Sequence, residues 1–182
     1  WERAVAIAKD IKSDSYLYQK AMGGLCQLTP FTGEKRECRN IGAELIEFGK
    51  RRSNIRSQVV GHMCIGHCYY ADGDLLKAAS SYRAAIKVAR DPFYTQWPKL
   101  YLAICAVLTG QMDEDADALN EVSNYIEQYG CEVFNGAALT FRGLMLIGRG
   151  EMTKGFELIQ KAKHYCDEVD SKWGMTLTEL VL

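Results

Sequence analysis

The stretch HMCIGHCYYADGDLLKAASSYRAAIKVARDP, residues 62–92, decides how this sequence folds. Small and apolar residues recur on both sides of Gly73 with the helical period, which predicts two short amphipathic helices joined at a glycine. The first seven residues also hold two histidines and two cysteines, residue types that bind metals or act as nucleophiles. Two interpretations therefore stand side by side, a structural helix pair and a chemical site.

The same helical period continues along nearly the whole chain, and no stretch alternates in the manner of a β-strand. With 182 residues, of which 48% are apolar and 25% charged, the chain has the composition of a folded globular protein. We therefore expect an all-α protein of about ten helices, including one at each end of the chain. The eight helices between them are expected at residues 16–28, 34–52, 57–71, 74–90, 96–109, 112–129, 134–148 and 151–168.

Three glycines, Gly73, Gly110 and Gly150, follow the first helices of three successive pairs. A small residue lies seven positions before each glycine, and a large apolar or aromatic residue lies nine positions after it. These are Gly66, Ala103 and Gly143 before, and Tyr82, Leu119 and Ile159 after. Small residues let two helices approach closely, and we expect the large ones to fill the space between neighbouring pairs. Such a unit cannot bury its apolar face alone, so the pattern predicts a stacked α-solenoid.

The unit from Val59 to Pro92 resembles the tetratricopeptide repeat (TPR). That family favours a small residue, a Tyr, a small residue, an aromatic and a small residue at fixed places, with a Gly-Asp turn between the helices. Here these are Gly66, Tyr69, Ala78, Tyr82 and Ala85, with Gly73 and Asp74 at the turn. The resemblance implies a right-handed superhelix of antiparallel helix pairs. Its repeats would span 15–54, 57–92, 96–131 and 134–169, flanked by half-repeats at 1–13 and 171–182 of a longer protein.

The units of this chain are longer than the usual tetratricopeptide repeat. In this they are similar to the divergent repeats that follow an ATPase module in large bacterial signalling proteins. Residues 39–52, 61–66 and 71–75 are similar to the repeat tails of bacterial nucleotide cyclases that carry such a module. The maltose-regulator type of transcription activator has comparable repeats. The resemblance implies a non-catalytic module for protein binding, as a scaffold or in signal transduction. The alternative function is that of a small-ligand-sensing regulatory domain of a transcription activator or cyclase.

By the same resemblance, fixed positions of each first helix line a concave groove that binds a peptide or partner domain, which can be another domain of the same chain. The expected partner-binding residues are Val60, Met63, His67, Tyr70, Trp97, Leu100, Ile104, Thr140 and Leu144. Most are apolar, which favours contact through buried anchors. The clamp that chaperone-binding repeats use for a peptide carboxylate needs Lys and Asn, whereas Met63 and His67 stand at these places.

Cys64, His67 and Cys68 are spaced so that they fall near one face of a helix, which makes them a candidate ligand set for zinc. A tetrahedral site needs a fourth ligand, and no second pair with ligand spacing occurs in the sequence. A cysteine nucleophile would need a positioned base and an oxyanion hole, and no local sequence motif indicates either one. We therefore expect packing roles for this segment, with no metal, no cofactor and no enzymatic activity.

Charge and cysteine content limit which partners and which cellular compartment we expect for this protein. A net charge of −1 argues against nucleic acid or a membrane surface as partner. Residues 100–141 hold seven acids and no Lys or Arg, whereas residues 34–56 hold seven basic residues and four acids. These are either solvated helix faces or surfaces for partners of opposite charge. Seven cysteines within helical patterns predict reduced, buried thiols in a cytoplasmic protein. Open terminal helices predict self-association.

Overall fold

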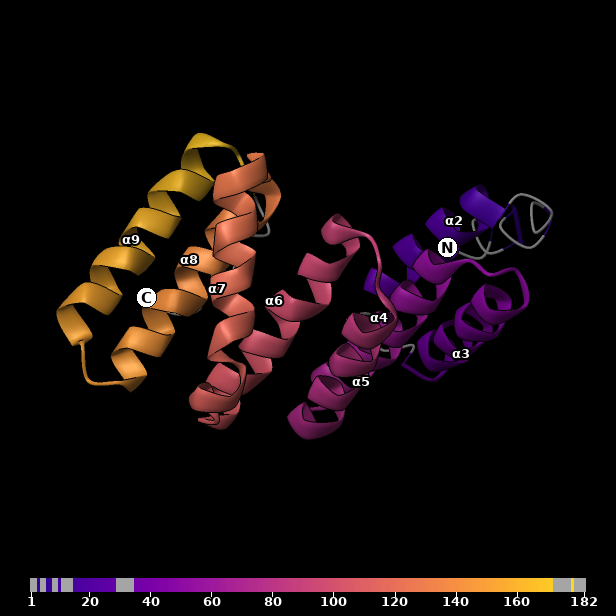
Figure 1. Ribbon diagram of the computed structural model, residues 1–182, viewed down its shortest axis with the longest axis horizontal. Helices are drawn as coiled ribbons and strands as arrows, with labels where there is room; N and C mark the ends of the chain where they lie inside the picture. The colour runs from indigo at the N-terminus through magenta and orange to yellow at the C-terminus, as the bar shows by residue number, and fades with distance from the viewer. Residues whose placement is uncertain are drawn as a thin grey trace. The chain divides into compact units, whose positions relative to one another are not determined.

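The fold is that of a computed structural model, which describes residues 15–28 and 35–171 together with isolated positions near each end. Within these residues there are eight α-helices, one short 3-10 helix and no strand, so the prediction of an all-helical protein is confirmed (Figure 1). The helices are α2 (Ser15–Leu28), α3 (Lys35–Arg51), α4 (Ile55–Ala71), α5 (Leu75–Val88), α6 (Pro92–Thr109), α7 (Met112–Tyr129), η2 (Glu132–Phe134), α8 (Asn135–Gly148) and α9 (Met152–Glu168).

Several expectations fall on residues outside this description. The helices and half-repeats expected at 1–13 and 171–182 lie almost wholly outside it, so the total of about ten helices stays a prediction. The side chains of residues 112–116 also lie outside it, although their backbone forms the first turn of α7. None of the described helices is long and apolar enough to cross a membrane.

Observed helix ends lie within two residues of the predicted ones except at α6, which begins four residues earlier, at Pro92 rather than at residue 96. The Asp91 carboxylate explains the early start, because it accepts hydrogen bonds from the backbone N–H groups of Phe93 at 3.0 Å and Tyr94 at 3.4 Å. Pro92 suits the first helical position, where its missing N–H leaves no bond unmade. The predicted repeat 57–92 ends at this proline, whereas in the structure it opens the next helix.

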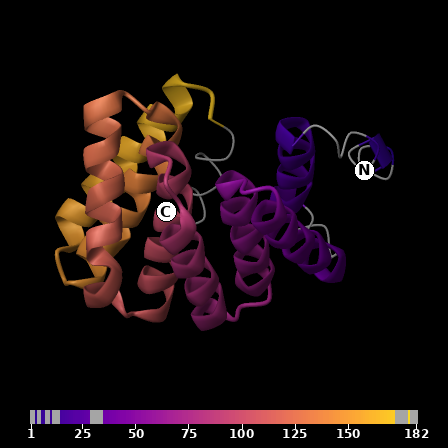
Figure 2. The same ribbon diagram turned by 45° about the vertical axis from the view of Figure 1, so that its right-hand side comes forward.

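The chain divides into two compact units, residues 1–98 and 99–182, and the boundary falls inside α6. In the first unit α4 packs against both α3 and α5, and α2 packs against α3 and α4. In the second unit α8 packs against α9, and the two run antiparallel (Figures 1 and 2). Each unit therefore contains at least one helix pair of the predicted kind.

The three glycines that were expected at helix ends lie there, each in the left-handed conformation. Gly73, Gly110 and Gly150 all have positive φ, at 77°, 72° and 85°. After α4, the N–H of Asp74 donates to the carbonyl of Tyr69 at 2.9 Å, a bond that closes the turn. The equivalent bond after α8 joins residues 151 and 146, also at 2.9 Å. The same left-handed glycine turn thus links both pairs.

The small and large residues of the repeat pattern contact each other. A Cβ atom on Gly66 would lie 2.5 Å from Cε1 of Tyr82, and one on Gly143 would lie 2.5 Å from Cγ1 of Ile159. Tyr82 and Ile159 are both fully buried. The expectation that the large side chains fill the space between neighbouring pairs misses this contact, which lies within one pair. The Tyr82 ring and the branched Ile159 side chain therefore each fit only because the facing helix has a glycine at the point of contact.

A second glycine contact brings helix backbones together. A Cβ on Gly61 of α4 would lie 2.6 Å from the carbonyl oxygen of Gly42 of α3, and the reverse distance, from Gly42, is 2.9 Å. Gly143 and Gly155 form the same reciprocal contact between α8 and α9, at 2.8 and 2.7 Å. Backbone groups cannot rotate away as side-chain ends can, so these positions fix how closely the helices pack.

We predict that Gly61→Ala destabilises the protein by about 2 kcal/mol, because the overpacking cost exceeds the gain in helix propensity of about 1 kcal/mol. Gly24→Ala in α2 is the matched control, since a Cβ there meets nothing within 4 Å. It should leave stability unchanged or raise it by up to about 1 kcal/mol. Urea unfolding followed by far-ultraviolet circular dichroism measures both, and a Gly61→Ala protein as stable as wild type would contradict the close backbone contact.

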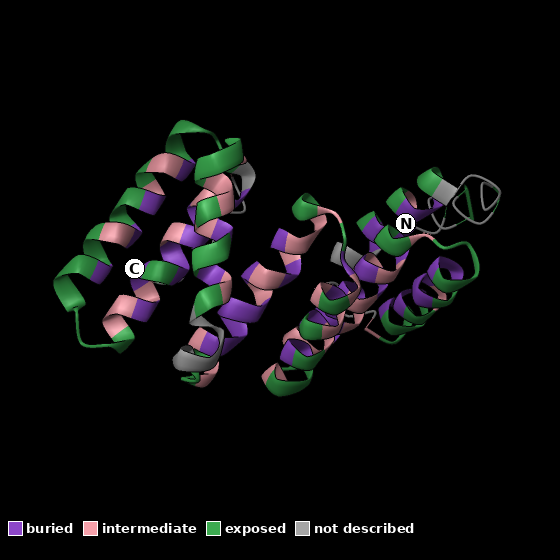
Figure 3. Cartoon of the chain, viewed as in Figure 1, coloured by how far each residue is buried: buried purple, intermediate pink, exposed green. Residues whose placement is uncertain are grey.

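The core of the first unit lies between α2, α3 and α4. One cluster joins apolar and thiol side chains from all three helices. Its members are Tyr18, Met22, Leu25, Cys38, Ile41, Leu45, Phe48, Cys64 and Cys68. Figure 3 shows the buried positions as a stripe along α3, with exposed positions on its other side. Five of the six described cysteines are buried, Cys131 is partly exposed, and none of the six is in a disulfide.

Candidate functional site

His67, which sequence analysis placed in the groove, lies inside the helix pair. Its ring is 2% exposed, and its Nδ1 forms a hydrogen bond of 2.8 Å with the hydroxyl of Tyr82 on α5. Burial lowers the pKa of the ring from 6.5 to about 4, so His67 is neutral at neutral pH. The ring thus contributes a buried polar contact to α5 and presents no open surface to a partner.

The neighbouring cysteines lie toward α3. The Cys38 thiol donates to the carbonyl of Cys64 at 3.7 Å, and the Cys68 thiol donates to the carbonyl of Lys35 at 3.5 Å. The prediction that Cys64, His67 and Cys68 share a face is therefore wrong, because the helix turns His67 toward α5. Among the described residues, no group of three His, Cys, Asp or Glu side chains could hold a metal ion.

The Cys68 thiol is also poorly suited to chemistry. A hydrogen bond with the Cys38 thiol, followed by burial, raises the pKa of Cys68 above its usual range. A thiol reacts and binds metals as the thiolate, and a raised pKa disfavours that form. These cysteines therefore behave as small apolar core residues.

One pocket brings together residues from α2, α4 and the first turns of α6, all within the first unit. Its volume is about 290 Å³, and we call it the apolar pocket. It is lined by Gln19, Lys20, Gly23, Gly24, Val60, Met63, Phe93, Tyr94 and Trp97. Three aromatic rings, a methionine and a valine form most of its wall. On the α2 side Gly23 packs closely against Val60, whereas a Cβ on Gly24 would meet nothing within 4 Å. The pocket suits a large apolar group.

The apolar pocket also contains a buried polar group. Gln19 is only 3% exposed, and no described residue forms a hydrogen bond with its carboxamide. A carboxamide can donate and accept at once, so it can bind a polar group of a ligand. Next to it on α2, the exposed Lys20 adds a positive charge at the rim. A ligand of this pocket would therefore gain from a polar group beside its apolar one.

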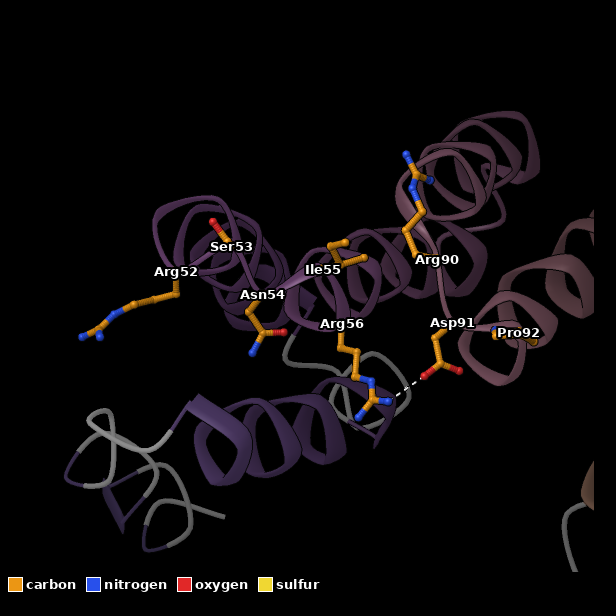
Figure 4. Close-up of a pocket in the computed structure, with 8 residues that line it drawn as sticks. All are labelled: Arg52, Ser53, Asn54, Ile55, Arg56, Arg90, Asp91 and Pro92. Carbon is orange, nitrogen blue, oxygen red and sulfur yellow. Dashed lines mark hydrogen bonds and ion pairs between the residues drawn. The ribbon is translucent and has the colours of Figure 1, made fainter.

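A second, larger pocket lies in the same unit, where two interhelical turns meet (Figure 4). Its volume is about 680 Å³, and we call it the arginine pocket. It is lined by Arg52, Ser53, Asn54, Ile55, Arg56, Arg90, Asp91 and Pro92. Both turns precede a helix, so the pocket faces the N-terminal ends of α4 and α6, where the helix dipole is positive.

A side-chain contact connects the two pockets. The guanidinium of Arg56 pairs with the Asp91 carboxylate at 2.6 Å and lies 5.2 Å from the centre of the Tyr94 ring. The Asp91 bond, with burial acting against it, raises the pKa of Arg56, and Arg56 in turn helps to lower the pKa of Asp91. Arg56 lines the arginine pocket and Tyr94 lines the apolar pocket, so the two pockets adjoin.

The structure assembles only part of the predicted groove. Val60, Met63 and Trp97 share the apolar pocket. Of the other expected residues, Tyr70 and Leu144 are half-buried, and the rest are buried. The buried ones are His67, Leu100, Ile104 and Thr140. The hydroxyl of Thr140 donates to the carbonyl of Gly136 in its own helix, at 2.8 Å. Leu100, Ile104, Thr140 and Leu144 belong to the second unit.

Sequence analysis missed the α2 side of the pocket and two of its aromatic residues. Gln19 and Gly24 belong to the unit whose repeat pattern is weakest, so no groove positions could be assigned there. Phe93 and Tyr94 were missed because α6 was expected to begin after them. The Asp91-Pro92 pair, a capping residue followed by a proline suited to the first helical position, was the signal that could have revealed the earlier start.

Comparison with known proteins adds no assignment to this geometry. No protein-family model matches the chain, and a search of curated proteins gives no significant match either.

Proposed function

We propose that this chain is a protein-interaction module and that its apolar pocket binds one large apolar side chain of a partner segment. The observation that carries the proposal is the pocket of about 290 Å³ formed by Val60, Met63 and Trp97 together with Phe93 and Tyr94. Aromatic and methionine side chains around a concave site are typical of adaptable contacts with a partner's anchor residue. The module has no chemistry of its own in this proposal.

The repeat pattern supports a fold of the tetratricopeptide kind for this module, arranged as an α-solenoid. The pairs α4–α5 and α8–α9 share the same left-handed glycine turn and the same contact of a small residue with a large one. When one structural unit is repeated, the same turn and the same contact recur at equivalent positions of each helix pair. We extend the proposal to a role as the regulatory, non-catalytic part of a multidomain signalling protein. Reduced, buried cysteines suit a location in the cytoplasm.

The size of the apolar pocket favours a side chain over a free small ligand. Small-molecule sites occupy about 300–1,000 Å³ and enclose most of their ligand. The apolar pocket lies just below that range and opens beside Gly24, whose Cβ position has nothing within 4 Å. The alternative, a small-ligand-sensing regulatory domain, draws support from the unbonded Gln19 carboxamide, which could orient a small molecule.

Filling the pocket mouth tests the proposal. We expect random peptides selected on the wild-type protein to share one large apolar residue and to bind Gly24→Trp at least about tenfold more weakly, because the indole occupies the space of the anchor. Gly24→Ala is the matched control and should bind these peptides like wild type, since its methyl group meets nothing nearby. Fluorescence polarisation with labelled peptides measures the affinities.

The outcome separates the two candidate functions. Selected peptides that bind Gly24→Trp and wild type equally would contradict peptide binding at this pocket. The ligand-sensing alternative would instead be supported if no peptide is selected and if a small molecule found by screening binds wild type but not Gly24→Trp. Circular dichroism spectra of the variants show whether each one is folded.

A further inference from the structure

We infer that the partner segment is an acidic peptide, with its apolar anchor in the apolar pocket and an aspartate or glutamate side chain in the arginine pocket. The inference rests on the proposed function and adds the chemistry of the partner. It commits to an extended peptide, because a helix has no free main-chain groups to offer the buried Gln19 carboxamide.

Charge in the arginine pocket is the first argument. Three arginines line it against one acid, and that acid already pairs with Arg56. No described acidic residue pairs with Arg52, and Arg90 donates only to the carbonyls of Lys87 and Ala89. In Figure 4 the two side chains extend away from the Arg56–Asp91 pair in different directions. Each guanidinium is thus available separately, and a single guanidinium can bind a carboxylate through two parallel N–H donors.

The connection between the pockets is the second argument. Tyr94 forms part of the apolar pocket and carries Arg56 against its ring, so a chain leaving the apolar pocket past Tyr94 reaches the arginine pocket. Lys20 adds another cation at the rim of the apolar pocket. Together the lining residues of both pockets are four cations and one acid. The complementary partner therefore carries apolar and acidic side chains in one short segment.

A peptide array with a moving glutamate tests the inference. Each peptide carries one tryptophan or leucine anchor in a neutral Gly/Ser background, and a single glutamate occupies each position in turn. We expect the tightest binder to have glutamate at one fixed distance from the anchor. We expect replacing that glutamate by glutamine to weaken binding about fivefold. Raising the salt concentration from about 0.1 M to about 1 M should weaken the glutamate peptide and leave the glutamine peptide little changed.

Matched charge variants locate the effect in the arginine pocket. The double variant Arg52→Gln/Arg90→Gln should lose the same factor of about five and should no longer distinguish glutamate from glutamine. Arg51→Gln/Lys87→Gln removes two exposed cations that do not line the pocket, and it should retain the preference. Equal losses in both double variants would overturn the inference, because they would indicate long-range attraction alone.

The same experiment distinguishes failure of the inference from failure of the proposed function. Peptides that bind wild type, fail on Gly24→Trp and ignore glutamate would refute the acidic partner and leave the apolar pocket standing. Peptides that bind Gly24→Trp as well as wild type would refute both.

Discussion

Replacing Tyr82 by alanine should lower the free energy of unfolding by about 4 kcal/mol, the largest loss that we expect from a single side chain in the first unit. The ring is fully buried, lies against Gly66 and forms the hydrogen bond with His67. Its removal leaves a cavity between α4 and α5 and takes away a partner of a buried ring nitrogen. Urea unfolding measures the loss, and amide hydrogen exchange in α5 assigns it to the first unit.

A second substitution at Tyr82 separates the contribution of the hydroxyl from that of the ring, and a substitution elsewhere on α5 is the control. Tyr82→Phe keeps the ring and removes the hydroxyl, so it should cost only about 1 kcal/mol. Leu76→Ala on the same helix removes a side chain that is 62% exposed and should change stability by less than about 0.5 kcal/mol. A Tyr82→Ala protein within 1 kcal/mol of wild type would show that the ring is not packed between the two helices as described.

The stability of the protein should fall as the pH drops from about 6.5 to about 4, and His67 should account for about 3 kcal/mol of that fall. The folded state holds the ring neutral because burial lowers its pKa, whereas the unfolded chain protonates it near pH 6.5. The unfolded state thus binds the extra proton first. The contribution of the neutral ring is complete above the unfolded pKa and is lost as the pH approaches the folded one.

The slope of stability against pH isolates this effect from any change in packing. In His67→Leu the slope between these pH values should become much shallower, whatever the absolute stability of the variant. His62 is a half-buried histidine, and burial followed by the charge of Lys50 also lowers its pKa, so His62→Gln should remove a smaller part of the slope. An unchanged slope in His67→Leu would contradict the buried, neutral state of that ring.

Local features of the chain were predictable because local interactions decide them. The helix ends followed from periodicity, and the turns followed from Gly73, Gly110 and Gly150, where the backbone takes a conformation that other residues rarely adopt. The repeat pattern marked Gly66 and Tyr82 as packing positions. It did not indicate that the two contact each other within one helix pair.

The candidate site was only partly predictable because its residues come from three helices that are distant in sequence. Val60, Met63 and Trp97 were expected to line one surface, whereas Gln19 and Tyr94 had no signal of their own. His67 illustrates the limit, since helical spacing places it near Cys64 and Cys68. The helices packed on either side then give them different environments, because the ring contacts Tyr82 of α5 and the Cys68 thiol contacts Lys35 of α3.

The sequence by itself determined an all-helical chain, the positions of its turns and the small residues at which helices meet, because each of these depends on a few neighbouring residues. Only the tertiary structure decided that His67 is buried against Tyr82, that the cysteines face α3, and that two pockets adjoin at Arg56 and Tyr94. Those features depend on which helix lies beside which, and packing between distant segments sets that arrangement.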